Sequence, residues 1–288
     1  MTSSTPPTSQ DLSPIAGARL LLVEDNELNQ EIALELLNLV GMQVDLAVNG
    51  QEALDLLRQN DYDLVFMDLK MPVLDGISAT RIIRRENRYD RLPIVAMTAN
   101  AMISDREDCL AVGMNDFIAK PIAPENLWAA LLRWVPPRRA APGAASPSRP
   151  TRPASTPDLD IPGLDSAGAL HRLLGNRGLY AHLLCKFAET QAEQPQKIQA
   201  ALADDDWPTA ERLAHSSKGA AASIGALEVQ ARAAELEQAL RERRPPQSAG
   251  GLFDAYAARL SSLIADLRGR KLGCEEAGKA GVAASRKD

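Results

Sequence analysis

The sequence has few of the features that mark secreted, zinc-binding or membrane proteins. Its three cysteines, Cys109, Cys185 and Cys274, are scattered and include no C-x-x-C pair, which argues against structural zinc and for a reducing compartment. No apolar run is long enough to span a bilayer. The polar, proline-rich residues 1–17 lack the basic region and apolar core of a signal peptide. We therefore expect a soluble, cytoplasmic chain that makes no membrane contact of its own.

Signals for nucleotide and nucleic-acid binding are also missing. There is no Gly-rich ATP-binding loop and no G-x-G-x-x-G, so neither a dinucleotide-binding enzyme nor a kinase with its own ATP-binding core is indicated. The net charge of −6 argues against a nucleic-acid partner. We attribute the arginines between 136 and 157 to solubility.

The first half of the chain alternates between short apolar runs and stretches of helical periodicity. Hydrophobic residues make up 45 % of the chain and aromatic residues only 4 %, so the cores should consist mainly of Leu, Ala, Val and Ile. Strands are predicted at 19–23, 42–48, 64–67, 93–97 and 116–119. Helices are predicted at 29–40, from 49, and at 77–85, 102–112 and 124–134. This pattern predicts an α/β domain with a doubly wound, five-stranded parallel sheet.

The second half shows only helical periodicity, and short connections favour an antiparallel bundle. Helices are predicted at 167–174, 179–190, 196–203, 208–223, 226–243 and 252–267. A stretch rich in Pro, Ala, Ser and Arg separates the two halves and is typical of a linker. We therefore predict a disordered start (1–18), an α/β domain (19–135), a linker (136–160), a separate all-α bundle (161–268) and a disordered tail (269–288).

Polar residues follow four of the five predicted strands. Because the carboxyl ends of parallel strands meet at one edge of a sheet, these side chains should converge. They are Glu24, Asp25, Asp68, Thr98 and Lys120. Taken singly, each has an ordinary alternative as a helix cap or a surface residue. Together, three carboxylates predict a Mg²⁺ site, and a nearby hydroxyl and lysine suit phosphoryl transfer with Asp68 as the nucleophile.

Four segments at these strand ends resemble the motifs of receiver domains of two-component signalling. The segments are Val23-Glu24-Asp25-Asn26, Met67-Asp68-Leu69-Lys70-Met71-Pro72-Val73-Leu74-Asp75-Gly76, Thr98-Ala99-Asn100-Ala101 and Lys120-Pro121. The resemblance covers residues 19–135 and implies that Asp68 is the phosphoacceptor. It further implies that Mg²⁺ is bound by Asp25, Asp68 and the backbone carbonyl of Lys70, with Glu24 acting through water.

The same resemblance implies roles for three more positions. Thr98 and Lys120 would hold the phosphoryl group, and the Lys120–Pro121 bond would be cis. Phe117 stands where receivers carry a rotating aromatic switch, although plain core packing explains it equally well.

His215 is the histidine with the most distinctive surroundings of the three. His171 and His182 have none, and we interpret them as ordinary helix residues. Around His215, Lys218 and Gly219 are three and four residues further along, so they neighbour it on the helix surface. A lysine there can meet an incoming phosphoryl group, and a glycine there leaves the imidazole open to another protein.

His215-x-x-Lys218-Gly219, followed by Ile-Gly-Ala, resembles the histidine phosphotransfer (HPt) domain, a helical bundle with one phosphoaccepting histidine. The resemblance covers 161–267 and implies that His215 is the acceptor, supported by Lys218 and Gly219. Ser217 departs from the leucine usual on the packing face, and Ala222-Ser223 replaces a usual Gly-Asn pair. Such changes can loosen the helix packing.

Our leading interpretation is a phosphorelay protein. A histidine kinase would donate a phosphoryl group to Asp68, which would exchange it with His215 for passage to a downstream receiver domain. In a second interpretation, the chain is the C-terminal part of a hybrid sensor histidine kinase. Histidine kinase activity would be expected only in that case. A third, from another class, is a scaffold module in which phosphotransfer has decayed.

Overall fold

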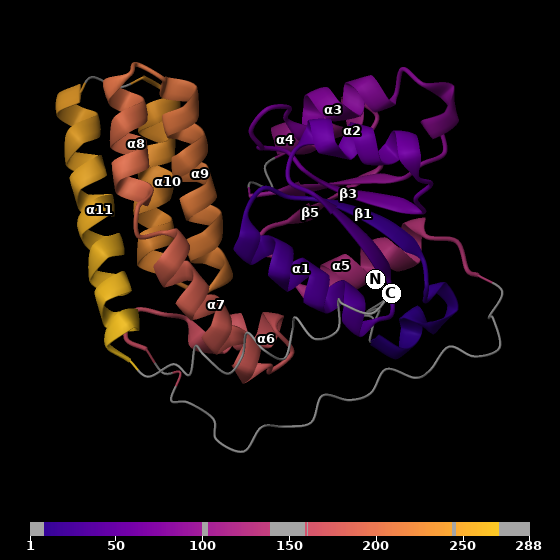
Figure 1. Cartoon of the computed structure of the whole chain (residues 1–288), viewed down its shortest axis with the longest axis horizontal. Helices are drawn as coiled ribbons and strands as arrows, with labels where there is room; N and C mark the ends of the chain where they lie inside the picture. Colours follow the sequence, from indigo (N-terminus) through magenta and orange to yellow (C-terminus); the bar gives the residue numbers. More distant parts are fainter. Residues whose placement is uncertain (1–8, 100–102, 139–158, 160, 244–245, 271–288) are drawn as a thin grey trace. The chain divides into compact units, whose positions relative to one another are not determined.

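A computed structural model describes residues 9–99, 103–138, 159, 161–243 and 246–270 (Figure 1). The chain divides into two compact units, Met1–Pro150 and Thr151–Asp288. Each unit is described by itself below. Within the described residues, no helix combines the length and the apolarity needed to cross a bilayer.

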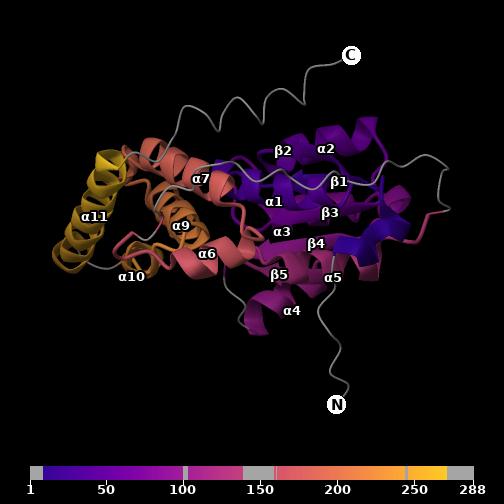
Figure 2. The same cartoon turned by 90° about the horizontal axis from the view of Figure 1, so that it is seen from below.

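The first unit contains one five-stranded sheet in which all neighbouring strands are parallel. Its strands are β1 (Arg19–Val23), β2 (Gln43–Ala47), β3 (Leu64–Asp68), β4 (Ile94–Thr98) and β5 (Asp116–Ala119). Their spatial order is β2-β1-β3-β4-β5, which can be followed from label to label in Figure 2. Every residue of β3 and β4 is buried, as expected for central strands covered on both faces. The predicted doubly wound parallel sheet is confirmed.

Helices cover both faces of this sheet. They are α1 (Glu27–Leu39), α2 (Gly50–Gln59), α3 (Gly76–Ile83), α4 (Ile103–Ala111) and α5 (Pro124–Trp134), with a short 3-10 helix η2 (Asn87–Tyr89) before β4. Figure 1 shows α2 and α3 on one face and α1 and α5 on the other. The side chains of Asn26, Asn49 and Asp75 accept hydrogen bonds from the first turns of α1, α2 and α3. These caps fix where each helix begins after its strand.

The start of the chain differs from the prediction of disorder. Residues 1–8 lie outside the described residues, but Ser9–Ile15 form a 3-10 helix, η1, which contacts α5. Leu12 and Ile15 are three residues apart and therefore share one face of this helix, and both are buried. For residues 9–18, the prediction of disorder is wrong because these two apolar side chains complete the core of the first unit.

The predicted linker also begins later than expected. The backbone N–H of Arg138 donates to the Pro14 carbonyl at 2.8 Å, and its guanidinium bonds the Gly17 carbonyl at 2.6 Å and the Asp63 carboxylate. Leu159, at the other end, is buried. The predicted linker residues 139–158 and 160, and the predicted tail from 271 onward, lie outside the described residues.

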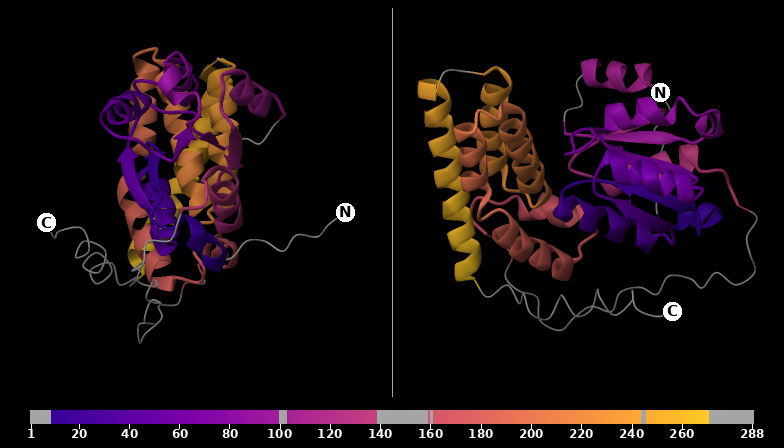
Figure 3. Two further views of the ribbon diagram at one scale, coloured as in Figure 1. Left: turned by 90° about the vertical axis from the view of Figure 1, so that its right-hand side faces the viewer. Right: turned by 45° about the horizontal axis from the view of Figure 1, so that its top comes forward.

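Every helix or strand found among the described residues of the second unit is a helix, as predicted. Its helices are α6 (Ser166–Arg172), α7 (Arg177–Thr190), α8 (Gln194–Ala203), α9 (Trp207–Ser223), α10 (Leu227–Arg241) and α11 (Pro246–Gly269). Helices α9 and α10 pack together closely, with α8 against α9 and α11 against α7 and α10. Figure 3 shows α11, in yellow, along one side of this bundle.

Small buried residues allow the close approach of α9 to its neighbours. Helix α9 buries five alanines and two serines: Ala210, Ala214, Ser217, Ala220, Ala221, Ala222 and Ser223. The helix ends at Ser223, and Gly225 follows two residues later with a φ of +79°, which is readily adopted only by glycine. A Cβ at Gly225 would meet the Asp165 carbonyl oxygen at 2.5 Å, so both the backbone conformation and the lack of space require glycine here.

Ser217 does not leave a loose contact in the packing face. Its hydroxyl lies 2.7 Å from the hydroxyl of Tyr256 on α11, and both residues are fully buried. Burial raises the pKa of Tyr256 to about 12, with the Ser217 hydrogen bond opposing the shift. The pair therefore replaces apolar contact with a satisfied hydrogen bond between α9 and α11.

A double-mutant cycle tests this pairing. Ser217→Ala or Tyr256→Phe alone is expected to lower the free energy of unfolding by about 1–3 kcal/mol, since Ser217→Ala strands the tyrosine hydroxyl and Tyr256→Phe strands the serine hydroxyl. The double variant should lose less than the sum of the two. Urea denaturation of the chain measures all four free energies, and strict additivity would contradict the pairing.

Candidate functional site

The predicted acid cluster lies at the carboxyl edge of the sheet. Glu24 and Asp25 follow β1, and Asp68 ends β3, the neighbouring strand. One oxygen atom from each of the three carboxylates lies within 4.8 Å of the other two. Glu24 and Asp68 are buried, while Asp25 is half-buried. Three carboxylate oxygens at this spacing form a donor set that suits a hard divalent cation.

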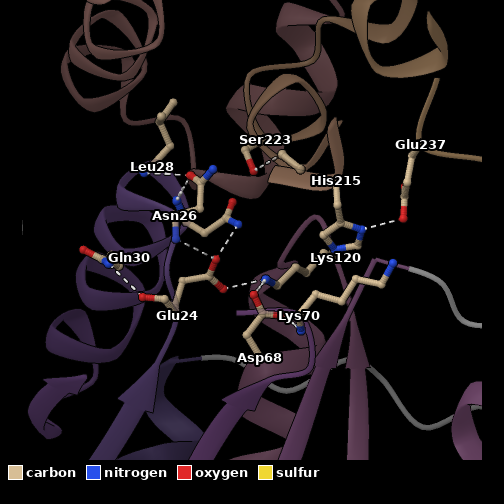
Figure 4. Close-up of polar contacts among 12 residues, drawn as sticks. Glu24, Asn26, Leu28, Gln30, Asp68, Lys70, Lys120, His215, Ser223 and Glu237 are labelled. Carbon is tan, nitrogen blue, oxygen red and sulfur yellow. Dashed lines mark hydrogen bonds and ion pairs between the residues drawn. The ribbon is translucent and has the colours of Figure 1, made fainter. Parts of the chain in front are cut away.

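Lys120 joins this cluster from the end of β5. Its backbone N–H donates to the Thr98 carbonyl at 2.7 Å, and the Lys120–Pro121 bond is cis, as the resemblance implies. The Lys120 ammonium lies 2.6 Å from Glu24 Oε2 and 2.7 Å from Asp68 Oδ2 (Figure 4). All three side chains are at most 5 % exposed, so these are buried ion pairs. One cation therefore bridges two buried carboxylates.

The first turns of α1 hold Glu24 in place. Asn29 Nδ2 donates to Glu24 Oε1 at 2.8 Å, and Gln30 Nε2 donates to the Glu24 carbonyl at 2.8 Å. The backbone N–H of Asn26 also bonds Oε1, at 3.3 Å. Asn29 and Gln30 are not among the predicted site residues. The sequence does contain a pattern that could have identified them, because both are polar residues on the buried side of a helix that begins just after an acid pair.

The charges in this cluster are strongly coupled. Burial raises the pKa of Glu24 to about 7; Lys120 opposes this shift and the Asp68 carboxylate adds to it. For Lys120, burial lowers the pKa, but attraction to Asp68 and Glu24 outweighs burial and holds it well above its usual value. Lys120 therefore stays charged, and a further cation would favour the ionised form of Glu24.

The remaining predicted residues of the first unit lie around the same edge. Thr98, which ends β4, is buried next to the strand that carries Asp68. The backbone N–H of Lys70 points to Asp68 Oδ1 at 3.4 Å. Phe117 is half-buried in β5, and the Arg106 guanidinium lies 5.2 Å from its ring centre.

In the second unit, His215 lies on α9 within a polar network (Figure 4). Its Nδ1 is 2.9 Å from Glu237 Oε1 on α10, and the Lys218 ammonium is 2.5 Å from Glu237 Oε2. Arg241 Nη2 also contacts Glu237 Oε1, at 2.7 Å, while its Nε bonds Glu211 at 2.9 Å. The structure thus brings His215 and Lys218 together through one carboxylate. Gly219, the next residue, accepts a hydrogen bond at its carbonyl from Ser223.

Glu237 is not among the predicted site residues. It is separated from His215 by 22 positions, and it reads as an ordinary charged residue in a polar helix. Its burial is the informative feature, because only 3 % of it is exposed. Burial opposes its ionisation, but hydrogen bonds and charges from His215 and Lys218 outweigh burial and hold the pKa of Glu237 well below its usual value.

The first unit has a parallel 2-1-3-4-5 sheet with an acid cluster and a lysine at its carboxyl edge. The second unit is helical and carries a histidine paired with a buried carboxylate. These features together are typical of a two-part signalling protein. Residues 20–132 match the family model of the response regulator receiver domain, and residues 182–269 match that of the Hpt domain. The chain contains a receiver domain followed by an Hpt domain. It takes part in phosphorelay signal transduction, for which such domains have histidine kinases and response regulators as partners.

Relatives support the same assignment. The sensor histidine kinase GacS of Pseudomonas protegens is 31 % identical over 230 residues, which is 78 % of this chain and 24 % of that protein. Hybrid signal transduction histidine kinase A of Dictyostelium discoideum is 42 % identical over 42 % of this chain and 6 % of its own length. The chain thus spans only a small part of the curated relatives it matches.

Among solved structures, one similar protein is the receiver domain of a sensor histidine kinase from Pseudomonas aeruginosa. It is 46 % identical and covers 41 % of this chain and 98 % of its own, with a TM-score of 0.39. That domain has a magnesium ion coordinated in its active-site cleft.

Removing the bridging ammonium should destabilise the first unit in a pH-dependent way. Lys120→Met is expected to lower the free energy of unfolding by about 3 kcal/mol near pH 8, because two buried carboxylates lose their shared cation. The pKa of Glu24 is raised to about 7 even though Lys120 holds it down, so without Lys120 it lies higher still, and near pH 5.5 the folded variant carries a proton on Glu24 that relieves the repulsion. The loss should therefore be smaller there.

Urea denaturation at the two pH values measures this difference. Lys70→Met removes the same charge from a half-buried side chain beside the cluster and serves as the control. Equal losses for Lys120→Met at both pH values would contradict the assigned coupling.

Proposed function

We propose that Asp68 accepts a phosphoryl group from a histidine kinase and exchanges it with His215 for passage to a further response regulator. The observation that carries this proposal is the buried Asp68 carboxylate, 2.7 Å from the Lys120 ammonium, at the sheet edge that also holds Glu24 and Asp25. A carboxylate there is a competent nucleophile, and the lysine offsets the charge of the incoming phosphoryl oxygens.

Each residue at this edge has a role in the proposal. An oxygen of Asp68 attacks phosphorus, while Lys120 and the hydroxyl of Thr98 hold the phosphoryl oxygens. The three carboxylates fit a divalent cation, which we take to be Mg²⁺, held by Asp25, Asp68 and the Lys70 carbonyl, with Glu24 acting through water. When bound, Mg²⁺ supplies positive charge that stabilises the transferring phosphoryl group. Phe117 reports the state of the site by its orientation.

The helical unit would carry the second phosphoacceptor. His215 accepts the phosphoryl group, and Lys218 and Gly219 support it by charge and by open access. We take 19–135 and 161–268 as the working units of the receiver and the Hpt domain, joined by 136–160. In the polar network around His215, the ring Nδ1 and the Lys218 ammonium both contact the Glu237 carboxylate. This network supports an intact acceptor and disfavours a decayed scaffold.

A second candidate is that this chain acts as part of a hybrid sensor histidine kinase. The observation that favours it is the similarity to GacS, which extends over 78 % of this chain and thus includes both units. Phosphoryl flow in that case would start at a kinase core on the same polypeptide.

Phosphotransfer in the isolated chain tests the relay. The chain is incubated with Mg²⁺ and labelled acetyl phosphate, or with a phosphorylated kinase core, alongside Asp68→Asn and His215→Gln. We expect an alkali-labile phosphate that is lost in Asp68→Asn, and an acid-labile phosphate that is lost in both variants. Label on Asp68 alone would show that the two acceptors serve different partners, and no label from either donor would refute the relay.

Cation binding can be measured separately by calorimetric titration with Mg²⁺. Asp25→Asn is expected to weaken binding by about tenfold or more, because a charged oxygen ligand becomes neutral. The control is Asp55→Asn, an equal change in charge at an exposed residue that pairs with Arg58 at 2.8 Å. Similar affinities for the two variants would place the cation elsewhere.

A further inference from the structure

The two carboxylate oxygens of Glu24 have different partners. Oε2 lies 2.6 Å from the Lys120 ammonium, which on its other side lies 2.7 Å from Asp68 Oδ2 (Figure 4). Oε1 faces α1, where it accepts hydrogen bonds from Asn29 Nδ2 at 2.8 Å and from the backbone N–H of Asn26 at 3.3 Å. A carboxylate that is held at both oxygens has a fixed plane, so the donors on Oε1 determine where Oε2 points.

Asn29 is the stronger of the two donors on Oε1. Its hydrogen bond is the shorter one, and only 5 % of the residue is exposed, so little water competes for the contact. An ionised carboxylate only accepts hydrogen bonds, so the nitrogen of the Asn29 amide must be the atom that faces it. Gln30, the next residue, donates to the backbone carbonyl of Glu24 and therefore does not orient the carboxylate.

The start of α1 places the Asn29 amide at this oxygen. Asn26 is the N-cap residue of α1, and its side chain accepts a hydrogen bond from the backbone N–H of Asn29, the third residue of the helix. In a capping box, the side chain of the third helical residue reaches back to the N-cap residue. Here the same side chain reaches two residues further back, to Glu24. The helix start therefore carries a donor that is directed at the acid cluster.

We propose that Asn29 is a positioning residue of the acid cluster: it occupies Glu24 Oε1 and so directs Oε2 to the Lys120 ammonium. Without this amide, the carboxylate can turn both oxygens towards the ammonium or towards a bound cation. Lys120 is then drawn away from Asp68, where its charge is needed when a phosphoryl group arrives. The importance of this position for transfer rests on the proposed function of Asp68.

The Lys120 ammonium can be observed without any cation or phosphoryl donor. Because it is buried and ion-paired, it should exchange slowly enough to give a ¹H–¹⁵N signal in the intact labelled chain, and Lys120→Met identifies that signal. We expect the signal to shift or disappear in Asn29→Leu, which keeps the size of the side chain but removes the donor. Asn38→Leu, the same change at an exposed residue near the other end of α1, should leave it unchanged.

Cation affinity and phosphorylation give two further readouts. Calorimetric titration with Mg²⁺ and labelling by acetyl phosphate are compared for the same variants at pH 8. We expect Asn29→Leu to weaken Mg²⁺ binding and to slow the appearance of alkali-labile label, each by about tenfold, as loss of a partner that orients a metal-site carboxylate typically does. Neither value should change in Asn38→Leu.

A double-mutant cycle with Glu24→Gln separates positioning from a purely structural role. If Asn29 acts through the Glu24 carboxylate, Asn29→Leu should cause little further loss of Mg²⁺ affinity once that carboxylate has been replaced. A general defect in α1 would instead cost the same factor in both backgrounds, and that result would refute the positioning role.

The unmodified chain provides a test that needs no variant to fold. The side-chain amide of Asn29 should give a signal that is protected from solvent exchange, and fast exchange would refute the contact. An unchanged Lys120 signal in Asn29→Leu, or equal Mg²⁺ affinities for Asn29→Leu and Asn38→Leu, would overturn the inference while the relay itself stood. If Asp68 accepted no phosphoryl group from any donor, the proposed function would fail, and the Lys120 signal would still decide the role of Asn29.

Discussion

A single ammonium group between two buried carboxylates is the constraint on which the receiver domain depends. Glu24 and Asp68 are buried at the ends of adjacent strands, where their charges would repel each other. Lys120 offsets that repulsion from the end of β5, and the amides of Asn29 and Gln30 hold Glu24 from α1. The parallel sheet supplies the common edge. One cation between two buried anions leaves the cluster short of positive charge, a condition that favours a divalent cation.

The Hpt unit has the opposite arrangement of charges, in which one anion contacts several basic groups. There one buried carboxylate, Glu237, serves an imidazole and two cations. Small residues on α9 allow the helices to approach closely enough for the carboxylate of α10 to reach His215. Packing and chemistry are therefore linked, since the same close contact that buries the alanines of α9 also excludes water from the hydrogen bond to Nδ1.

The sequence predicted the strands, helices and strand-end residues because each depends on local pattern. Apolar runs followed by Asp or Lys identify strand tips, and His215-x-x-Lys218 lies within one helical turn. Contacts between distant segments were not predictable in this way: Glu237 is far from His215 along the chain, and Tyr256 is far from Ser217. The ordered start was missed because Leu12 and Ile15 are isolated apolar residues in a polar, proline-rich segment. Their burial follows from the surface offered by α5, which local periodicity does not reveal.

The contacts of Arg138 have a consequence for how such a domain can be used. Its bonds to Pro14, Gly17 and Asp63 tie the incoming and outgoing chain together at the amino-terminal edge of the sheet. The acid cluster lies at the opposite edge, one strand length away, or about 17 Å. Both connections thus leave the fold on the side away from its chemistry. We therefore expect that segments flanking such a receiver domain can be lengthened, shortened or exchanged between proteins without changing the geometry around Asp68.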